Sequence, residues 1–130
     1  TRDAAQLGAD LVFAGGEALK ATGDVPLAAG TLMIGLPEWQ DEASAAVPQF
    51  EEAKIVPEGY VLPAYAAVEV AAAALADSAA AGKPAKDLLP DRDFTTAIGT
   101  VRFDGEGNLA RNPYRLFRYD GERFRPVTPP

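Results

Sequence analysis

The sequence contains neither cysteine nor histidine among its 130 residues. This excludes metal sites built from thiolate and imidazole ligands, cysteine nucleophiles and every Ser-His-Asp triad. Positive charge is also scarce, since 12 lysines and arginines stand against 19 acidic residues and give a net charge of −7. A chain with this balance repels phosphate backbones, so we expect no nucleic-acid partner. We also expect no metal centre and no cofactor.

Long hydrophobic runs are lacking as well. The longest apolar stretch, Pro63 to Ala76, is interrupted by Glu69 and is predicted to be too short and too weakly hydrophobic to span a bilayer. No signal peptide is visible at Thr1, so the sequence begins after any export signal or never had one. The apolar share of 48% nevertheless favours a folded domain with a core over disorder.

The pattern of apolar residues, glycines and prolines predicts an α/β fold with a mixed sheet and a C-terminal β-hairpin. The helix predicted over 61–81 is apolar nearly all round, so we expect it to be packed centrally. Asp120-Gly121 predicts a two-residue hairpin turn within a final β-meander. The predicted elements are a helix at 1–7, buried strands at 11–14 and 31–34, helices at 41–54, 61–81 and 84–89, and strands at 98–103, 114–119 and 123–127.

Four segments resemble, in order, the C-terminal portion of type I periplasmic solute-binding proteins of the leucine/isoleucine/valine ABC-transporter family. GYVLPAYAAVEVAAAAL, Gly59 to Leu75, resembles the family's segment with a Tyr-Ala-Ala-Val core. Ile98 to Val127 resembles the family's ending, in which Gly-x-Val/Leu-x-Phe/Trp-Asp-x-x-Gly-Asp/Asn-Leu precedes a last hairpin. Arg2 to Leu19 and Ala29 to Pro37 resemble the elements that lead into the third crossing between lobes.

The resemblance implies a periplasmic-binding-protein fold in which this segment contributes to both lobes. Residues 1–37 would form the end of lobe 2 and the crossing strand, 38–111 the C-terminal part of lobe 1, and 112–130 the return to lobe 2 with the terminal hairpin. The residues at the two crossings are hinge candidates, because a crossing must absorb backbone rotation. They are Gly35, Pro37, Asn112 and Pro113. For the first crossing, a simple strand-ending turn is an equally good alternative.

Two side chains are candidates for ligand binding. The resemblance aligns Glu17 with the acidic residue that pairs with the ligand's α-ammonium group, and a buried ammonium needs such a carboxylate. It aligns Tyr65 with a tyrosine that lines the cleft, where the ring would contact an aliphatic side chain. The alternatives are a solvated loop residue for Glu17 and a core aromatic for Tyr65. Trp39 is either a cleft-rim residue or an exposed loop aromatic.

The resemblance implies a solute-binding component of an ABC importer that captures a branched-chain or similar small amino acid between two hinged lobes. Its location would be periplasmic or extracytoplasmic, and its partners would be an inner-membrane ABC permease and the missing N-terminal part of the same protein. The alternative is a ligand-sensing or regulatory domain of the same fold. We do not expect an enzyme, because the residues form no nucleophile–base constellation. Asp104 to Asn108 lacks the twelfth-position glutamate of a calcium loop.

Overall fold

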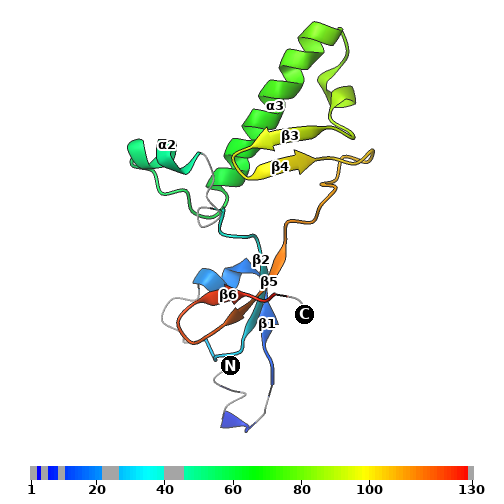
Figure 1. Cartoon of the computed structure of the whole chain (residues 1–130). Coiled ribbons are helices and arrows are strands. Elements are labelled where there is room, and N and C mark those ends of the chain that lie inside the picture. The colour runs from blue at the N-terminus through cyan, green and yellow to red at the C-terminus, as the bar shows by residue number, and fades with distance from the viewer. Residues whose placement is uncertain (1–2, 4–5, 9–10, 22–26, 40–45, 129–130) are drawn as a thin grey trace. The chain divides into compact units, whose positions relative to one another are not determined.

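The computed structural model forms two units that together contain helices and two sheets (Figure 1). It describes residues 3, 6–8, 11–21, 27–39 and 46–128. Unit 1 comprises Thr1–Pro37 and Pro113–Pro130, and unit 2 comprises Glu38–Asn112. The chain therefore leaves and re-enters unit 1 within one residue of the crossings that the sequence predicts. The assignment of the units to lobes stays a prediction, whereas the mixed α/β class is confirmed.

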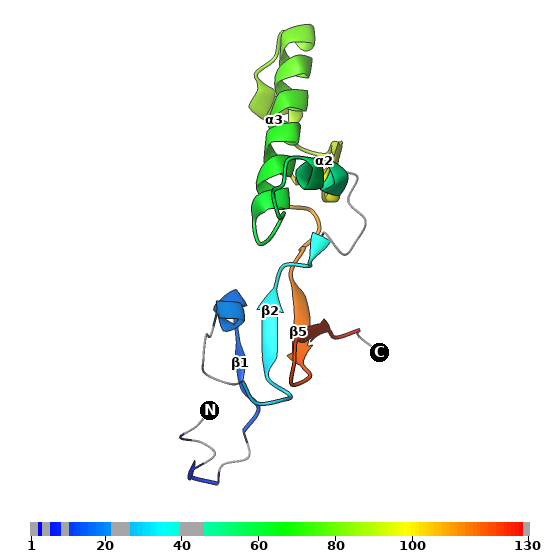
Figure 2. The same cartoon turned by 90° about the vertical axis from the view of Figure 1, so that its left-hand side faces the viewer.

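The sheet of unit 1 joins strands from both ends of the chain. Its order is β1 (Ala14–Gly15), β2 (Leu32–Gly35), β5 (Arg115–Tyr119) and β6 (Phe124–Pro126). β1 runs parallel to β2, and the other neighbours are antiparallel, which makes the sheet mixed (Figure 2). The predicted C-terminal hairpin is thus present as β5 and β6.

The two faces of this sheet differ in exposure. Met33 lies opposite Phe117 in the ladder, and both side chains are buried. The next pair, Ile34 and Leu116, points to the other face, because successive side chains of a strand alternate. These two side chains are 58% and 40% exposed. One face therefore carries the core of unit 1, and the other presents apolar side chains to solvent.

The first strand departs from the prediction of a buried strand at 11–14. β1 is limited to Ala14–Gly15, and Leu11 and Val12 are 59% and 77% exposed. The apolar run fits a buried strand by composition, but in the described sheet β1 is an edge strand that pairs with β2 alone. The predicted helix at 1–7 and the first part of the helix at 41–54 fall largely outside the described residues. Of the latter, the structure describes α2 (Val47–Glu52).

The long helix α3 (Val61–Ala81) has the bounds that the sequence predicts. Its buried residues recur every four positions and therefore share one face. They are Leu62, Ala66, Val70 and Ala74. The described residues do not surround the helix as the sequence led us to expect, because Val68 and Leu75 on other faces are 67% and 63% exposed. Small alanine side chains make the helix apolar all round without requiring burial all round.

The same helix corrects the expectation about membrane spans. Val61–Ala81 is long and apolar enough to cross a membrane by length and composition, and 22% of its most apolar window is buried. The sequence prediction interrupted the apolar run at Glu69, whereas the 21-residue helix includes that residue without a break. Core helices of soluble proteins can be equally long and apolar, so length and composition alone do not assign a membrane span to α3.

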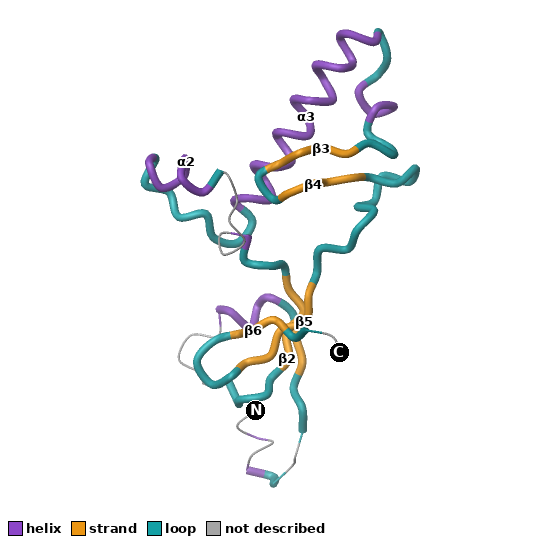
Figure 3. Tube along the Cα trace, viewed as in Figure 1, coloured by secondary structure: helices purple, strands orange, loops and turns teal. Residues whose placement is uncertain are grey.

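Unit 2 also contains a two-stranded sheet beside α3 (Figures 1 and 3). Its strands are β3 (Asp93–Thr96) and β4 (Gly99–Arg102), and the 3-10 helix η3 (Ala85–Leu88) precedes them. Phe94 packs with Val70 and Ala74 of α3 in the core. Partly buried side chains surround this cluster: Ala73, Ala85, Leu89, Val101 and Phe103. The predicted strand at 98–103 corresponds to β4, but β3 was not predicted.

The hairpin turns are also distributed differently from the prediction. Asp120-Gly121 belongs to a four-residue loop, because Tyr119 pairs with Phe124. The two-residue turn is instead Ala97-Ile98, between the paired residues Thr96 and Gly99. The predicted β-meander is wrong, since these two hairpins lie in separate sheets.

The end of α3 permits a test of backbone strain. Gly82 caps the helix with φ of +64°, a left-handed conformation that L-residues with a Cβ adopt at a cost. We expect Gly82→Ala to lower the free energy of unfolding by about 1 kcal/mol, measured by urea denaturation. Gly105→Ala is the matched control, because a Cβ there also meets open space but its φ is not positive. Equal stabilities of the two variants would contradict the prediction.

The loop of the C-terminal hairpin permits a test of pH dependence. Asp120 Oδ1 accepts hydrogen bonds from the backbone N–H groups of Arg123 and Glu122, and Arg125 Nε donates to Oδ2 at 2.8 Å. These bonds, with that from the Arg123 backbone the strongest, hold the pKa of Asp120 well below its usual range. A carboxyl group with a lowered pKa stabilises the fold fully only above its unfolded pKa of about 3.9.

We therefore expect the wild-type chain to be more stable than Asp120→Asn at neutral pH. This advantage should shrink as the pH falls from about 4 toward the lowered pKa, because the asparagine does not titrate. Urea denaturation at a series of pH values measures it. Glu122→Gln is the control, since it removes an exposed carboxylate from the same loop. A difference between wild type and Asp120→Asn that is constant with pH would contradict the assignment.

Candidate functional site

Glu17 opens the 3-10 helix η1 (Glu17–Ala21), two residues after β1 ends. Its half-buried carboxylate accepts a hydrogen bond from the backbone N–H of Leu36, with 2.8 Å between the nitrogen and Oε1. Leu36 directly follows β2, so the bond joins the segments at the carboxyl ends of two parallel strands. This edge is where α/β sheets place ligand-binding groups. The contact with an ammonium group stays a prediction.

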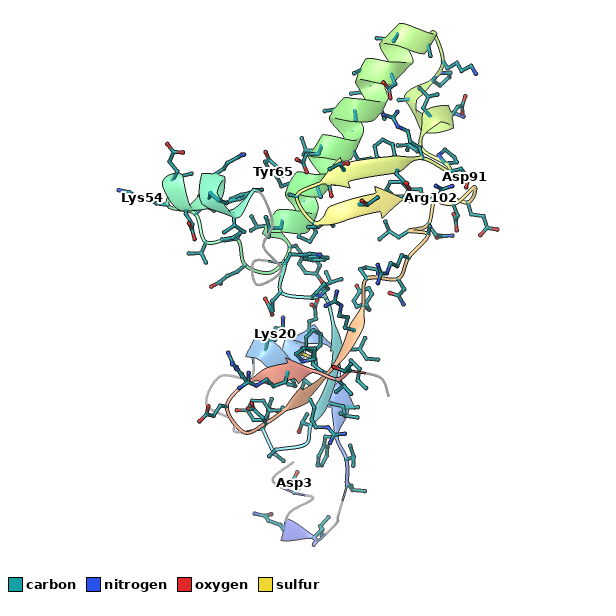
Figure 4. All side chains as sticks on the ribbon, in the orientation of Figure 1. Asp3, Lys20, Lys54, Tyr65, Asp91 and Arg102 are labelled. Carbon is teal, nitrogen blue, oxygen red and sulfur yellow. The ribbon has the colours of Figure 1, made fainter. Side chains whose placement is uncertain are left out.

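Tyr65 lies on α3 in unit 2 (Figure 4). Its ring packs edge-on against Phe50 of α2, with 5.4 Å between the ring centroids. The side chain remains 38% exposed. A ring that is held by one aromatic neighbour and partly open to solvent can serve as one wall of an apolar subsite. Its role in ligand binding stays a prediction.

The hinge candidates lie at the two passages between the units. Gly35 and Pro37 are buried, Asn112 is exposed and Pro113 is half-buried. The unit boundaries fall between Pro37 and Glu38 and between Asn112 and Pro113. Their positions suit a hinge, and rotation about them stays a prediction.

Two other sequence features have a structural role. Trp39 is only 8% exposed, so its description as an exposed loop aromatic is wrong.

In the loop after β4, Asp104 Oδ1 accepts hydrogen bonds from the backbone N–H groups of Glu106 and Asn108, each at 2.9 Å. These bonds, that from Asn108 above all, lower the pKa of Asp104. The carboxylate thus organises its own loop.

The sequence did not predict the polar contacts that the β3–β4 hairpin makes at its two ends. Glu69 of α3 accepts a hydrogen bond at 2.7 Å from the backbone N–H of Ala97, in the two-residue turn. An acidic residue in the apolar part of a helix indicates a tertiary partner, because a carboxylate that loses water must be hydrogen-bonded. The pattern does not identify that partner. At the other end of the same hairpin, Arg102 of β4 pairs with Asp91 and with Asp93 of β3, at 3.4 and 3.3 Å. Figure 4 labels Arg102 and Asp91.

Within the described part of the chain, acidic residues do not gather in groups that would hold a metal ion. Comparison with protein-family models and with curated proteins gives no match. At the candidate site the structure brings together Glu17, Gly35 and Leu36. Tyr65 lies in the other unit.

Proposed function

We propose that the chain is the C-terminal part of a type I periplasmic solute-binding protein of an ABC importer. The protein binds a branched-chain or similar small amino acid between two hinged lobes and is not an enzyme. The observation that carries the proposal is the carboxylate of Glu17, fixed by Leu36 at the carboxyl edge of the parallel strands. An amino-acid ligand needs such a carboxylate, because its ammonium group loses water on binding and requires an ion partner.

The path of the chain supports the proposal. Unit 1 is discontinuous, since its sheet contains β1 and β2 from before unit 2 and β5 and β6 from after it. Two passages between units are what a protein with hinged lobes requires for a rotation that leaves each lobe intact. Glu17 is tied to the residue that precedes Pro37 at the first passage.

The exposed apolar surfaces support a larger protein. The sheet of unit 1 exposes Ile34 and Leu116 on one face, and α3 of unit 2 exposes Val68 and Leu75. Contiguous apolar side chains on a surface often mark a contact with other polypeptide. We propose that further polypeptide of the same protein, N-terminal to this segment, packs against these surfaces. In the periplasm, the liganded protein would then bind an inner-membrane permease.

Thermal-shift measurements on the full-length protein with a panel of amino acids test the proposal. A ligand at 100 times its Kd stabilises the folded state by about 2.7 kcal/mol and therefore raises Tm. We expect leucine, isoleucine or valine to raise it. 4-Methylpentanoate, which is leucine without its ammonium group, should have no effect. The absence of a response to every amino acid would overturn the proposal.

A further inference from the structure

The carboxylate of Glu17 is held in place by the chain itself. Its Oε1 accepts the bond from the Leu36 N–H across 19 positions of sequence. A hydrogen bond between a backbone N–H and an ionised carboxylate is stronger than one between neutral groups. The bond therefore restricts the rotamers of a side chain that is otherwise flexible.

Gly35 provides the space for this arrangement. A Cβ at Gly35 would lie 2.9 Å from Cγ of Glu17 and 3.2 Å from its Oε1. Carbon atoms of real side chains do not approach so closely, so any larger residue at position 35 must displace the Glu17 side chain. The φ of Gly35 lies outside the left-handed region, which leaves the close approach as the reason for glycine.

We infer that Gly35 and the backbone N–H of Leu36 are positioning elements that aim the Glu17 carboxylate at a ligand's ammonium group. This inference rests on the proposed function. An ionised carboxylate has two oxygens and about four acceptor sites, so it can bind several donors at once, the Leu36 N–H and an ammonium group among them. Because the carboxylate is ordered before the ligand arrives, binding does not have to immobilise it.

The tether links the ligand contact to the crossing segment. Leu36 stands immediately before Pro37, the last residue of unit 1 before the chain passes to unit 2. An ammonium group that engages Glu17 therefore acts on a carboxylate bonded to the backbone of this segment. Ligand specificity follows from the same geometry: a cationic amine is favoured, and a second carboxylate at this position is repelled.

Gly35→Ala in the full-length protein tests the inference. We expect two changes: hydrogen exchange of the Leu36 amide about tenfold faster, and leucine affinity about tenfold weaker in calorimetry. Tm should change little, because the displaced group is a side chain. Gly105→Ala, a substitution into open space, is the control and should alter neither quantity.

Glu17→Gln separates the tether from the charge. The amide oxygen of glutamine can still accept the Leu36 bond, so we expect retained protection of that amide together with a loss of leucine affinity. In the wild type, saturation with leucine should shift the Leu36 amide resonance, which is a measurement that requires no variant.

The outcomes distinguish this inference from the proposed function. Unchanged leucine affinity in a Gly35→Ala protein whose Leu36 amide has lost protection overturns the inference alone. An unmoved Leu36 resonance in leucine-saturated wild type also overturns it alone. A wild-type protein that binds no amino acid overturns both. Loss of protection and of affinity together supports the inference.

Discussion

Glu17→Ala is expected to weaken leucine binding by the full-length protein by about 3–5 kcal/mol, the cost of leaving a buried charge without its partner. The ligand brings an ammonium group into a site from which water is excluded, and the proposed ion pair compensates for its lost hydration. The substitution also removes the acceptor of the Leu36 N–H. Isothermal titration calorimetry of wild type and variant measures the effect.

A matched control for this substitution lies in the same unit. Glu122→Ala makes the same glutamate-to-alanine change at an exposed position in the C-terminal hairpin and should leave leucine affinity unchanged. Glu17→Ala should also leave binding of 4-methylpentanoate as weak as in the wild type, because that compound has no ammonium group. Equal leucine affinities of wild type and Glu17→Ala would refute the assigned contact.

Phe94→Ala is expected to have the largest effect on stability. Phe94 is 3% exposed, packs against α3 and contacts Phe103 edge-on, with 6.3 Å between ring centroids. The guanidinium carbon of Arg92 lies over the Phe94 ring, 4.8 Å from its centroid. Truncation removes these contacts and leaves a cavity, which together cost about 3–5 kcal/mol. Unit 2 should therefore lose most of its stability.

The single tryptophan of the sequence provides the measurement. Trp39 belongs to unit 2 and is 8% exposed, so its fluorescence should change when that unit unfolds in urea. Val56→Ala, which truncates a side chain that is 69% exposed, is the control and should change stability by less than about 0.5 kcal/mol. A similar midpoint for both variants would show that Phe94 is not central to the core.

Local signals were sufficient to predict α3. Pro63 marks the beginning of the helix, because proline is tolerated in a first turn, and Gly82 marks its end, because glycine adopts the left-handed cap conformation. Both signals act through the local backbone and do not depend on the rest of the fold. β5 could also be predicted locally, because it combines leucine, phenylalanine and tyrosine, of which the two aromatics favour strands, and because the turn residues Asp120 and Gly121 follow it. These elements depend on interactions between neighbours in sequence.

The hairpin of β3 and β4 shows why other features were not predicted. Ala97-Ile98 lacks the glycine or asparagine that marks most two-residue turns, and a carboxylate 28 positions away bonds to its backbone. Membership in a sheet is equally non-local, since the sequence of β5 does not indicate that its neighbour is β2. At the candidate site, the Glu17 alignment was available from sequence. Its bond to Leu36 and the close approach at Gly35 required coordinates.

The discontinuity of unit 1 sets an order on folding during synthesis. Unit 2 is one continuous segment and has all its strands as soon as residue 112 has left the ribosome. β2, in contrast, must wait for β5, whose first residue is translated 80 positions after β2 ends. Pairing over that separation is slow, and until then the strand exposes its hydrogen-bonding edge to other nascent chains. Translation of the last hairpin thus completes the sheet that presents Glu17.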